Sequence, residues 1–375
     1  MHLTGTRRRD LLGLLAGGLA WPLLPLRLRA ETGRRLYLSA RADEAGGFRV
    51  SGFDPDGRPA FDLPLPARGH SFAIRPDGRV AVHFARRPGS FAQVIDLDRG
   101  LVLHEIETPD DRHFYGHGAF SPDGRLLYAT ENDFAAERGV LGVYDTADRF
   151  RRVGELPSHG IGPHELRLMA DGETLVVANG GILTRPDLPR VKLNLPTMAP
   201  SLAYIDRRDG KLLQEVRLPA DLHQLSIRHL ALGRDDTVAM AMQYQGPAGD
   251  FVPLVATHRR RGPVTLFDGP DAVLRSMAHY CGSTAFDVEG RVLAVSAPRG
   301  NRITFWDSAT GAHLSSVPVQ DGCGVAPTAR PGQFLASSGR GGVMAIDART
   351  GALTPVRSDF LAAGHWDNHM VAVPA

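Results

Sequence analysis

The sequence predicts an all-β fold, a seven-bladed β-propeller closed by pairing of its N- and C-terminal strands. One observation is a repeated unit of strand, Asp-Gly turn and strand at residues 68–83, 115–129 and 162–177. A second is a set of third strands that each end in an aspartate before a polar turn, at residues 96, 145, 206, 307 and 347. Short strands that recur every roughly 40 to 50 residues are the sequence signature of propeller blades.

The length and composition fit one closed domain. The chain has 375 residues, and we place a single propeller at residues 31–375. The content of turn residues, Gly 42 and Pro 27, agrees with many tight connections between strands. The formal net charge is only +2 and no strongly basic run occurs in the body of the chain, so we expect no nucleic-acid partner. We expect a monomer with no transmembrane segment in the mature chain.

Residues 1–30 have the pattern of a twin-arginine signal peptide. Arg8 and Arg9 precede an apolar run at residues 11–26, and Ala30 ends a potential cleavage site. A membrane anchor is the alternative interpretation, but the run is short for a span and is interrupted by glycines and prolines. We therefore expect export by the twin-arginine pathway to the periplasm.

The first blade is predicted from three strand-like runs at residues 35–40, 47–51 and 60–64. These runs are one strand short of a four-stranded blade, and residues 369–373 near the C-terminus supply the missing inner strand. Pairing the two ends of the chain in one blade closes the ring without leaving an open sheet edge.

The remaining six blades follow in order, each beginning with its inner strand. With the C-terminal strand included, the equivalent inner-strand positions are 70, 117, 164, 229, 283, 325 and 369. Two insertions, at residues 180–200 and 243–261, lengthen blades four and five. Long loops in compact repeats are often functional, so these insertions either cover one mouth of the channel or pack between blades.

Five of the seven equivalent positions are histidine, although the whole chain has only His 15. They are His70, His117, His164, His229 and His369. Inner strands run beside the propeller axis, so these imidazoles should form a ring around the channel. Imidazole is a common ligand of iron, copper and zinc, so we expect the ring to bind one of these metals or another small ligand. The other interpretation is that the histidines bond carbonyl groups and waters along a polar channel.

Five further residues are candidates to orient the histidines or to contact a substrate: Glu131, Asn132, Glu165, His365 and Asn368. Glu165 follows directly after a ring histidine, while His365 and Asn368 come just before the last one. Asp367, between them, is also suited to orient a histidine, because an imidazole that binds metal through one nitrogen donates its other N–H to an acceptor.

Cys281 and Cys323 are the only cysteines. In an oxidising compartment two cysteines favour one disulfide, although metal ligation and simple burial stay open. The sequence contains no Cys-x-x-Cys-His motif, which excludes covalent c-type haem. It also lacks a Gly-x-Ser-x-Gly elbow, a phosphate-binding glycine loop and a His-Glu-x-x-His helix motif.

Several motifs resemble a family of twin-arginine-exported periplasmic β-propellers of unknown function. They lie at residues 160–165, 177–182 and 296–301, the last just ahead of Phe-Trp-Asp307. Members of that family are often encoded beside imelysin-type iron-regulated proteins and a di-haem cytochrome related to peroxidases. The resemblance implies a periplasmic role in iron acquisition or handling, with these proteins as partners, and it provides no established catalytic residues.

Three function classes follow from the sequence. The leading one is a periplasmic propeller that binds a metal or a metal-bearing ligand through its histidine ring. The second is an enzyme, either a metal-dependent oxidoreductase or a lactonase-like hydrolase. The third is a protein-interaction scaffold with an empty channel.

Overall fold

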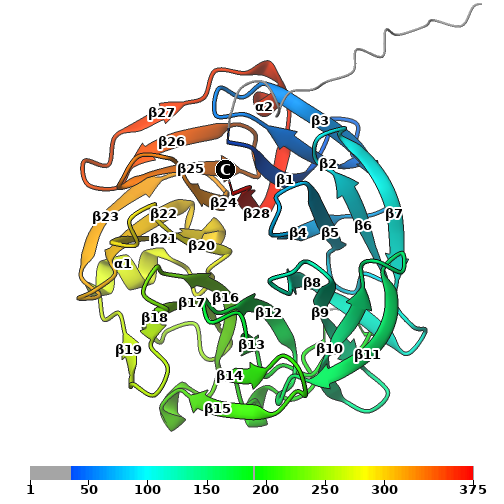
Figure 1. Ribbon diagram of the computed structural model, residues 1–375. Helices are drawn as coiled ribbons and strands as arrows, with labels where there is room; N and C mark the ends of the chain where they lie inside the picture. Colours follow the sequence, from blue (N-terminus) through cyan, green and yellow to red (C-terminus); the bar gives the residue numbers. More distant parts are fainter. Residues whose placement is uncertain (1–34, 189–190, 375) are drawn as a thin grey trace, which may run out of the picture.

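The computed structural model describes residues 35–188 and 191–374, and within them it has seven four-stranded antiparallel sheets. The sheets are arranged as blades around a central axis (Figure 1). The predicted seven-bladed propeller is therefore confirmed. The predicted signal peptide at residues 1–30 lies outside the described residues.

Blade one combines the two ends of the described chain. Its strand order is β28-β1-β2-β3, with β1 (Tyr37–Ala42), β2 (Phe48–Phe53), β3 (Pro59–Leu65) and β28 (His365–Ala372). Leu38 pairs with Val371 across the junction, and the Ser39 hydroxyl donates to the His369 carbonyl at 2.6 Å. The predicted closure by the C-terminal strand is thus confirmed, with strand ends shifted by only a few residues.

Blades two to four each use four consecutive strands. In chain order these are β4 (Gly69–Ile74), β5 (Val80–Ala85), β6 (Phe91–Asp96), β7 (Leu101–Glu107), β8 (Arg112–Phe120), β9 (Leu126–Asp133), β10 (Arg138–Asp145), β11 (Arg151–Pro157), β12 (Pro163–Leu168), β13 (Thr174–Asn179), β14 (Ser201–Asp206) and β15 (Leu212–Arg217).

Blades five to seven follow the same plan. Their strands are β16 (Leu225–Leu232), β17 (Val238–Tyr244), β18 (Val255–His258), β19 (Val264–Leu266), β20 (Ser283–Phe286), β21 (Val292–Ala297), β22 (Arg302–Asp307), β23 (His313–Pro318), β24 (Gly322–Pro327), β25 (Gln333–Ser338), β26 (Val343–Asp347) and β27 (Leu353–Pro355). The third strand of blade five, β18, lies inside the segment 243–261 that the sequence suggested as an insertion.

The Asp-Gly turns set the repeat. At the turn between β4 and β5, the Asp77 carboxylate accepts the backbone N–H of Arg79 at 3.0 Å, and Gly78 has φ +66°. Glycine occupies this left-handed conformation without steric cost, which is why the turn residue recurs as Gly124 and Gly172, both at φ +68°. Hairpins with the same turn geometry place equivalent positions of their inner strands at the same height along the propeller axis.

The core lies between neighbouring blades, where strand side chains pack face to face. Trp306, Phe305 and Phe334 are fully buried in this way, whereas the outermost strand β7 exposes Leu101 and Leu103. The described residues also form five short helices: η1 (Leu195–Thr197), η2 (Ala220–Leu222), α1 (Asp271–Ser276), η3 (Pro298–Gly300) and α2 (Asp359–Ala362). None of the helices in the described ranges is both long and apolar enough to cross a membrane.

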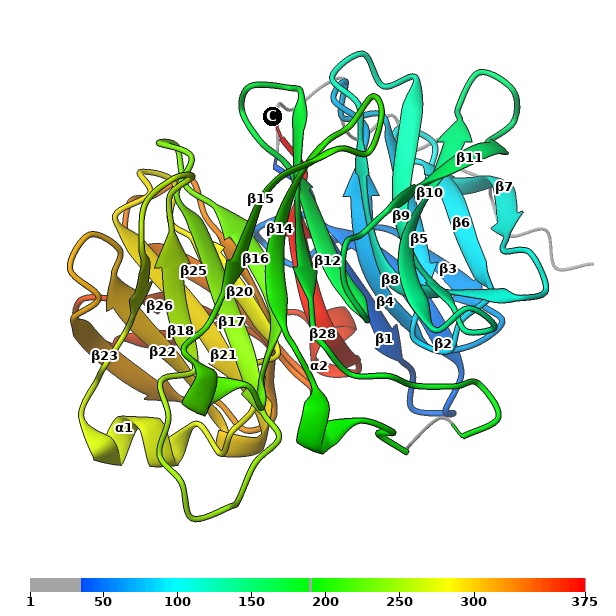
Figure 2. The same ribbon diagram turned by 90° about the horizontal axis from the view of Figure 1, so that it is seen from below.

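The two mouths of the channel differ. Figure 2 shows α1 and residues 180–188 and 191–200 toward one face of the ring, while the C-terminal end of the chain lies at the opposite face. Lys192, in that segment, donates a hydrogen bond to the Gln245 side chain, which follows β17. The two insertions therefore meet at one mouth of the channel, which we call the insertion mouth.

Candidate metal centre

Six of the seven inner strands change register at the same level of the channel. A shift of one or more residues interrupts the pairing at residues 69–72 in β4, 114–118 in β8, 163–165 in β12, 227–229 in β16, 322–325 in β24 and 366–370 in β28. Such β-bulges re-aim side chains and are common beside functional sites. Five of these six strands carry a histidine in or beside the irregular segment, so the bulges turn imidazoles toward the axis.

The five predicted ring histidines converge. Ring centroids are 4.5 Å apart for His70 and His369, 4.7 Å for His117 and His369, and 4.9 Å for His164 and His229. Within His70, His117 and His164 the nearest ligand nitrogens lie within 4.8 Å of one another, and the same holds for His117, His229 and His369. We call these five residues the histidine cluster.

Several nitrogens of the cluster are buried without a hydrogen-bond partner in the described part of the chain. In the described part of the chain, Nε2 of His117, His229 and His369 has no hydrogen-bond partner. Leaving buried polar atoms unpaired is costly and needs an explanation such as an ion or a water. Nitrogens bound to one metal at about 2.0 to 2.1 Å would lie roughly 3 to 4 Å apart, so the observed spacing needs only small side-chain shifts.

Two buried carboxylates lie behind the cluster. Glu165 Oε2 is 3.6 Å from His117 Nδ1 and 3.4 Å from His229 Nδ1. Asp367 Oδ1 is 3.6 Å from His70 Nδ1. A carboxylate that faces Nδ1 favours the tautomer in which Nε2 carries the free lone pair, which is the form that binds a metal.

Each carboxylate is held on its other side by arginine. Arg167 pairs with Glu165 at 2.6 Å, and Arg68 pairs with Asp367 at 2.5 Å. Burial by itself raises the pKa of both carboxyl groups, but the arginines and histidines around them outweigh it and hold each pKa well below its usual range. Both groups are therefore anionic and can accept an imidazole N–H.

The imidazoles of the cluster are neutral at ordinary pH. Burial lowers the pKa of His70 to about 4, although Asp367 acts in the opposite direction. Burial likewise lowers the pKa of His117, His164 and His369 well below the ordinary 6.5, and it lowers that of His229. Neutral imidazole is the ligand form, so no proton has to leave before a metal binds.

The metal-free protein should lose stability as pH falls from about 6.5 to 5. A histidine with a depressed pKa in the folded state does not change the free energy of unfolding above pH 6.5. Below this pH the imidazole binds a proton in the unfolded chain but not in the folded chain, and the folded state is destabilised. For His70 alone, a shift from 6.5 to about 4 corresponds to ~3 kcal/mol across the full window. Urea unfolding at pH 8, 6 and 5 measures this, and equal stabilities at pH 8 and 5 would contradict it.

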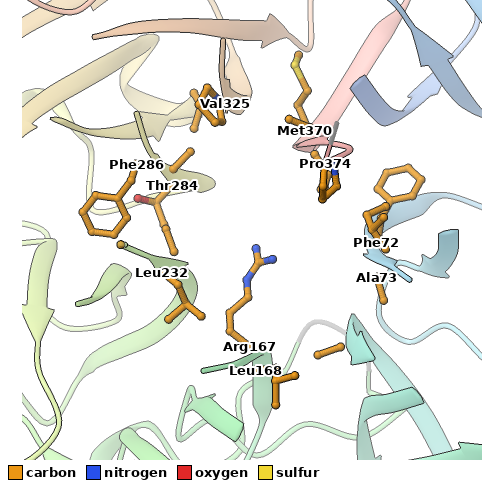
Figure 3. A pocket seen from close by; sticks show the side chains of 18 of the residues that line it. Phe72, Ala73, Arg167, Leu168, Leu232, Thr284, Phe286, Val325, Met370 and Pro374 are labelled. Atoms are coloured by element: carbon orange, nitrogen blue, oxygen red, sulfur yellow. The ribbon is translucent and has the colours of Figure 1, made fainter. Parts of the chain in front are cut away.

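Two cavities flank the cluster. The one at the insertion mouth has a volume of about 480 Å³, and His70, His164 and His229 open onto it. The other, of about 530 Å³, lies beyond the opposite ends of the inner strands and is lined largely by apolar side chains such as Phe72, Phe286 and Met370. Figure 3 shows the Arg167 side chain reaching into this second cavity. The cluster is thus accessible mainly from the insertion mouth.

The structure places two of the sequence candidates away from the cluster. Glu131 on β9 accepts a hydrogen bond from the Tyr144 hydroxyl at 2.6 Å and pairs with Arg152 at 2.9 Å, inside blade three. Asn132, next to it, lies 3.0 Å from His113 Nε2. Both residues are on the second strand of blade three, and their side chains contact neighbouring strands and, for Asn132, the Thr184 carbonyl rather than the cluster.

Asn368 and His365, the two candidates that precede His369, lie in different places. Asn368 lines the cavity at the insertion mouth and donates to the Tyr280 hydroxyl at 3.3 Å. His365 is exposed, and its Nδ1 lies 3.1 Å from the Gly339 carbonyl in a different pocket between blades one and seven. Of the five candidates, Glu165 therefore contacts the cluster and Asn368 its cavity.

The predicted disulfide is not formed. Cys281 and Cys323 are both free and buried thiols, in separate surroundings. Cys281 Sγ faces the Leu254 carbonyl at 3.7 Å, and burial raises the pKa of its thiol to about 12. Cys323 Sγ lies 3.8 Å from Asp321. Thiols held protonated in this way are poor metal ligands and poor nucleophiles.

Fold and site together define a seven-bladed β-propeller with a buried histidine cluster across its channel. Residues 63–373 match the family described as a protein of unknown function (DUF1513), and the chain belongs to that family. Among solved structures, Kuenenia stuttgartiensis hydrazine synthase is similar, with a TM-score of 0.60 and 17% identity over 93% of this chain and 100% of that chain. At this identity the likeness shows the fold alone. No curated protein matches the sequence.

Proposed function

We propose that the protein binds a transition-metal ion through the histidine cluster, with iron as the favoured metal and copper as the alternative. The observation that carries this proposal is the convergence of five imidazoles. In three of them, His117, His229 and His369, the buried Nε2 atom has no hydrogen-bond partner in the described chain. Neutral nitrogen donors suit iron, copper and zinc rather than magnesium or calcium. The two carboxylates behind the ring supply the acceptors that such ligands normally require.

We further propose that this metal site serves iron acquisition or handling in the periplasm. The N-terminal pattern of Arg8, Arg9 and an apolar run supports export by the twin-arginine pathway. The choice of iron, and of imelysin-type proteins and a di-haem cytochrome as partners, rests on the resemblance to exported propellers encoded beside them. The absence of a Cys-x-x-Cys-His motif excludes covalent c-type haem, and in this proposal the histidine side chains hold the metal as an ion.

The proposal is tested by the metal content of protein isolated from its own compartment. We expect one iron per chain, with copper in its place as the stated alternative. Metal-free protein titrated with Fe²⁺ under nitrogen, and separately with Cu²⁺ and Zn²⁺, should bind one ion per chain. If none of the three ions binds, the histidines are a polar lining of the channel and the protein is a scaffold.

Replacing Glu165 by glutamine should weaken metal binding by about 10- to 100-fold, because an uncharged amide holds the His117 and His229 imidazoles less firmly in the ligand tautomer. Calorimetric titration of both proteins with the same ion measures the change. Glu173→Gln is the matched control, since Glu173 also forms ion pairs with arginines, Arg207 and Arg208, but lies in the turn between β12 and β13, outside the cluster. An unchanged affinity in Glu165→Gln would mean that this carboxylate serves only to pair Arg167.

A further inference from the structure

The cavity at the insertion mouth is strongly cationic. Its lining includes five positively charged side chains, which come from blades two, five and six and from the segment 180–200: Arg86, Arg87, Lys192, Arg228 and Arg299. The other lining residues are the three open histidines, two tyrosines, two glutamines and an asparagine. No carboxylate lines this cavity in the described chain. We call these five residues the cationic mouth.

Most of these charges are uncompensated. Arg86 alone has an acidic partner among the described residues, because its guanidinium lies 3.3 Å from Asp367. Arg87 donates to the Thr184 hydroxyl at 3.2 Å, and Lys192 donates to Gln245. Arg299 lies over the Tyr280 ring, 4.5 Å from its centroid. Like charges that converge without counter-charges repel one another, unless an anion binds between them.

Arg228 is the most buried of the cations in this cavity that lack an acidic partner in the described chain. Its residue is only 8% exposed, it approaches His164 Nδ1 at 3.4 Å, and its Nε has no partner in the described chain. A buried charge of this kind is normally paired, so an anionic ligand is the missing partner.

We infer that the cationic mouth binds a small multivalent oxyanion, a polycarboxylate or a phosphate, directly above the histidine cluster. The volume of about 480 Å³ falls in the range of small-molecule sites. Arginine is suited to this ligand because its planar fork of N–H donors matches carboxylate and phosphate oxygens. This inference rests on the proposed metal function, because it names what binds at the open side of the metal.

Binding of the metal ion in the histidine cluster and binding of the oxyanion in the cationic mouth should each raise the affinity for the other ligand. A divalent ion in the cluster adds positive charge beneath four cations that already lack acidic partners in the described chain, and an oxyanion above it offsets that charge. Because His70, His164 and His229 open onto the same cavity, oxygen atoms of the anion can also reach the metal from the mouth. Thermodynamic linkage then requires that the anion raises metal affinity by the same factor as the metal raises anion affinity.

The test is calorimetric titration of the full-length mature protein with citrate and, separately, with phosphate, before and after loading with one metal ion. We expect binding of at least one of them, tighter in the loaded protein. The double variant K192Q/R299Q should weaken anion binding by at least 10-fold, while its metal affinity in anion-free buffer does not fall. Both residues are exposed, so their replacement should not disturb folding. Arg357→Gln is the control, since Arg357 is exposed and lies outside the cavity.

The outcomes separate the two proposals. Binding of citrate only, of phosphate only or of both supports the inference and identifies the source of the oxyanion. The inference is overturned if neither anion binds in either state, or if K192Q/R299Q binds the anion as the control does. Metal binding without anion binding removes this inference alone. Anion binding without metal binding removes the proposed metal site and leaves the cationic mouth as an independent anion site.

Discussion

Replacing His117 by alanine is expected to weaken metal binding by at least about 100-fold while leaving the propeller folded. His117 belongs to both groups of converging ligand nitrogens, with His70 and His164 on one side and with His229 and His369 on the other. Its loss removes a ligand from either arrangement, and no other described imidazole lies at that position. The fold should persist because blade three is held by its strand pairing and its buried core rather than by this side chain.

The measurement is titration with one metal ion, together with circular dichroism and thermal unfolding of both proteins. His365→Ala is the matched control, because this exposed histidine also lies in an inner strand but outside the cluster. We expect His365→Ala to bind as the unchanged protein does. If His117→Ala keeps full affinity and its fold, the metal ligands lie elsewhere and the cluster is a polar channel lining.

Removing residues 365–375 is expected to abolish soluble, monomeric protein. These residues include β28, the inner strand of blade one, and without it β1 presents an unpaired edge inside an opened ring. The deletion also takes Trp366 and Met370 out of a buried apolar cluster with Tyr37 and Phe53. Loss of the backbone pairing between β1 and β28 and of two core side chains lowers the free energy of unfolding by more than the stability of most domains.

Size-exclusion chromatography and circular dichroism compare the shortened chain with a control that lacks only residues 374 and 375. The control retains all of β28 and the hydrogen bond from Val373 N–H to the Leu36 carbonyl. We expect the control to elute as a folded monomer and the longer deletion to aggregate. A folded monomer from the longer deletion would mean that blade one is stable without its inner strand.

The architecture was predictable because it follows from local chemistry that repeats. Asp-Gly turns such as the one at Asp77 and Gly78 mark the first hairpins of blades two, three and four, and the three strands at the N-terminus required a fourth from the C-terminus. Blade five was harder, because β18 lies inside a segment whose turns lack this chemistry. The bulges could not be predicted, since they depend on how several inner strands pack around one axis.

The site was predictable where it depended on strand register. The histidines share one register, and Glu165 follows His164 directly, so the chain itself brings them to one level. Glu131 and Asn132 were placed near the cluster only by their residue type, and their position on the second strand keeps them in the blade.

The cationic mouth was not predicted. Lysine and arginine are frequent, 43 in the whole chain, and single residues such as Arg228 and Arg299 carry no local signal of convergence. Their proximity is a product of the closed ring, which brings together positions that are distant in sequence. An arginine on the same inner strand as a ring histidine, as Arg228 is, was the one available indication.

X-ray absorption spectroscopy of the metal-loaded protein tests the central claim most directly. The histidine cluster predicts at least three imidazole nitrogens in the first coordination sphere, at about 2.0 to 2.1 Å, with the multiple scattering typical of imidazole rings. The Glu165→Gln protein should show the same kind of ligands at lower occupancy. A bound ion surrounded only by oxygen, or by fewer than two imidazoles, would contradict the account.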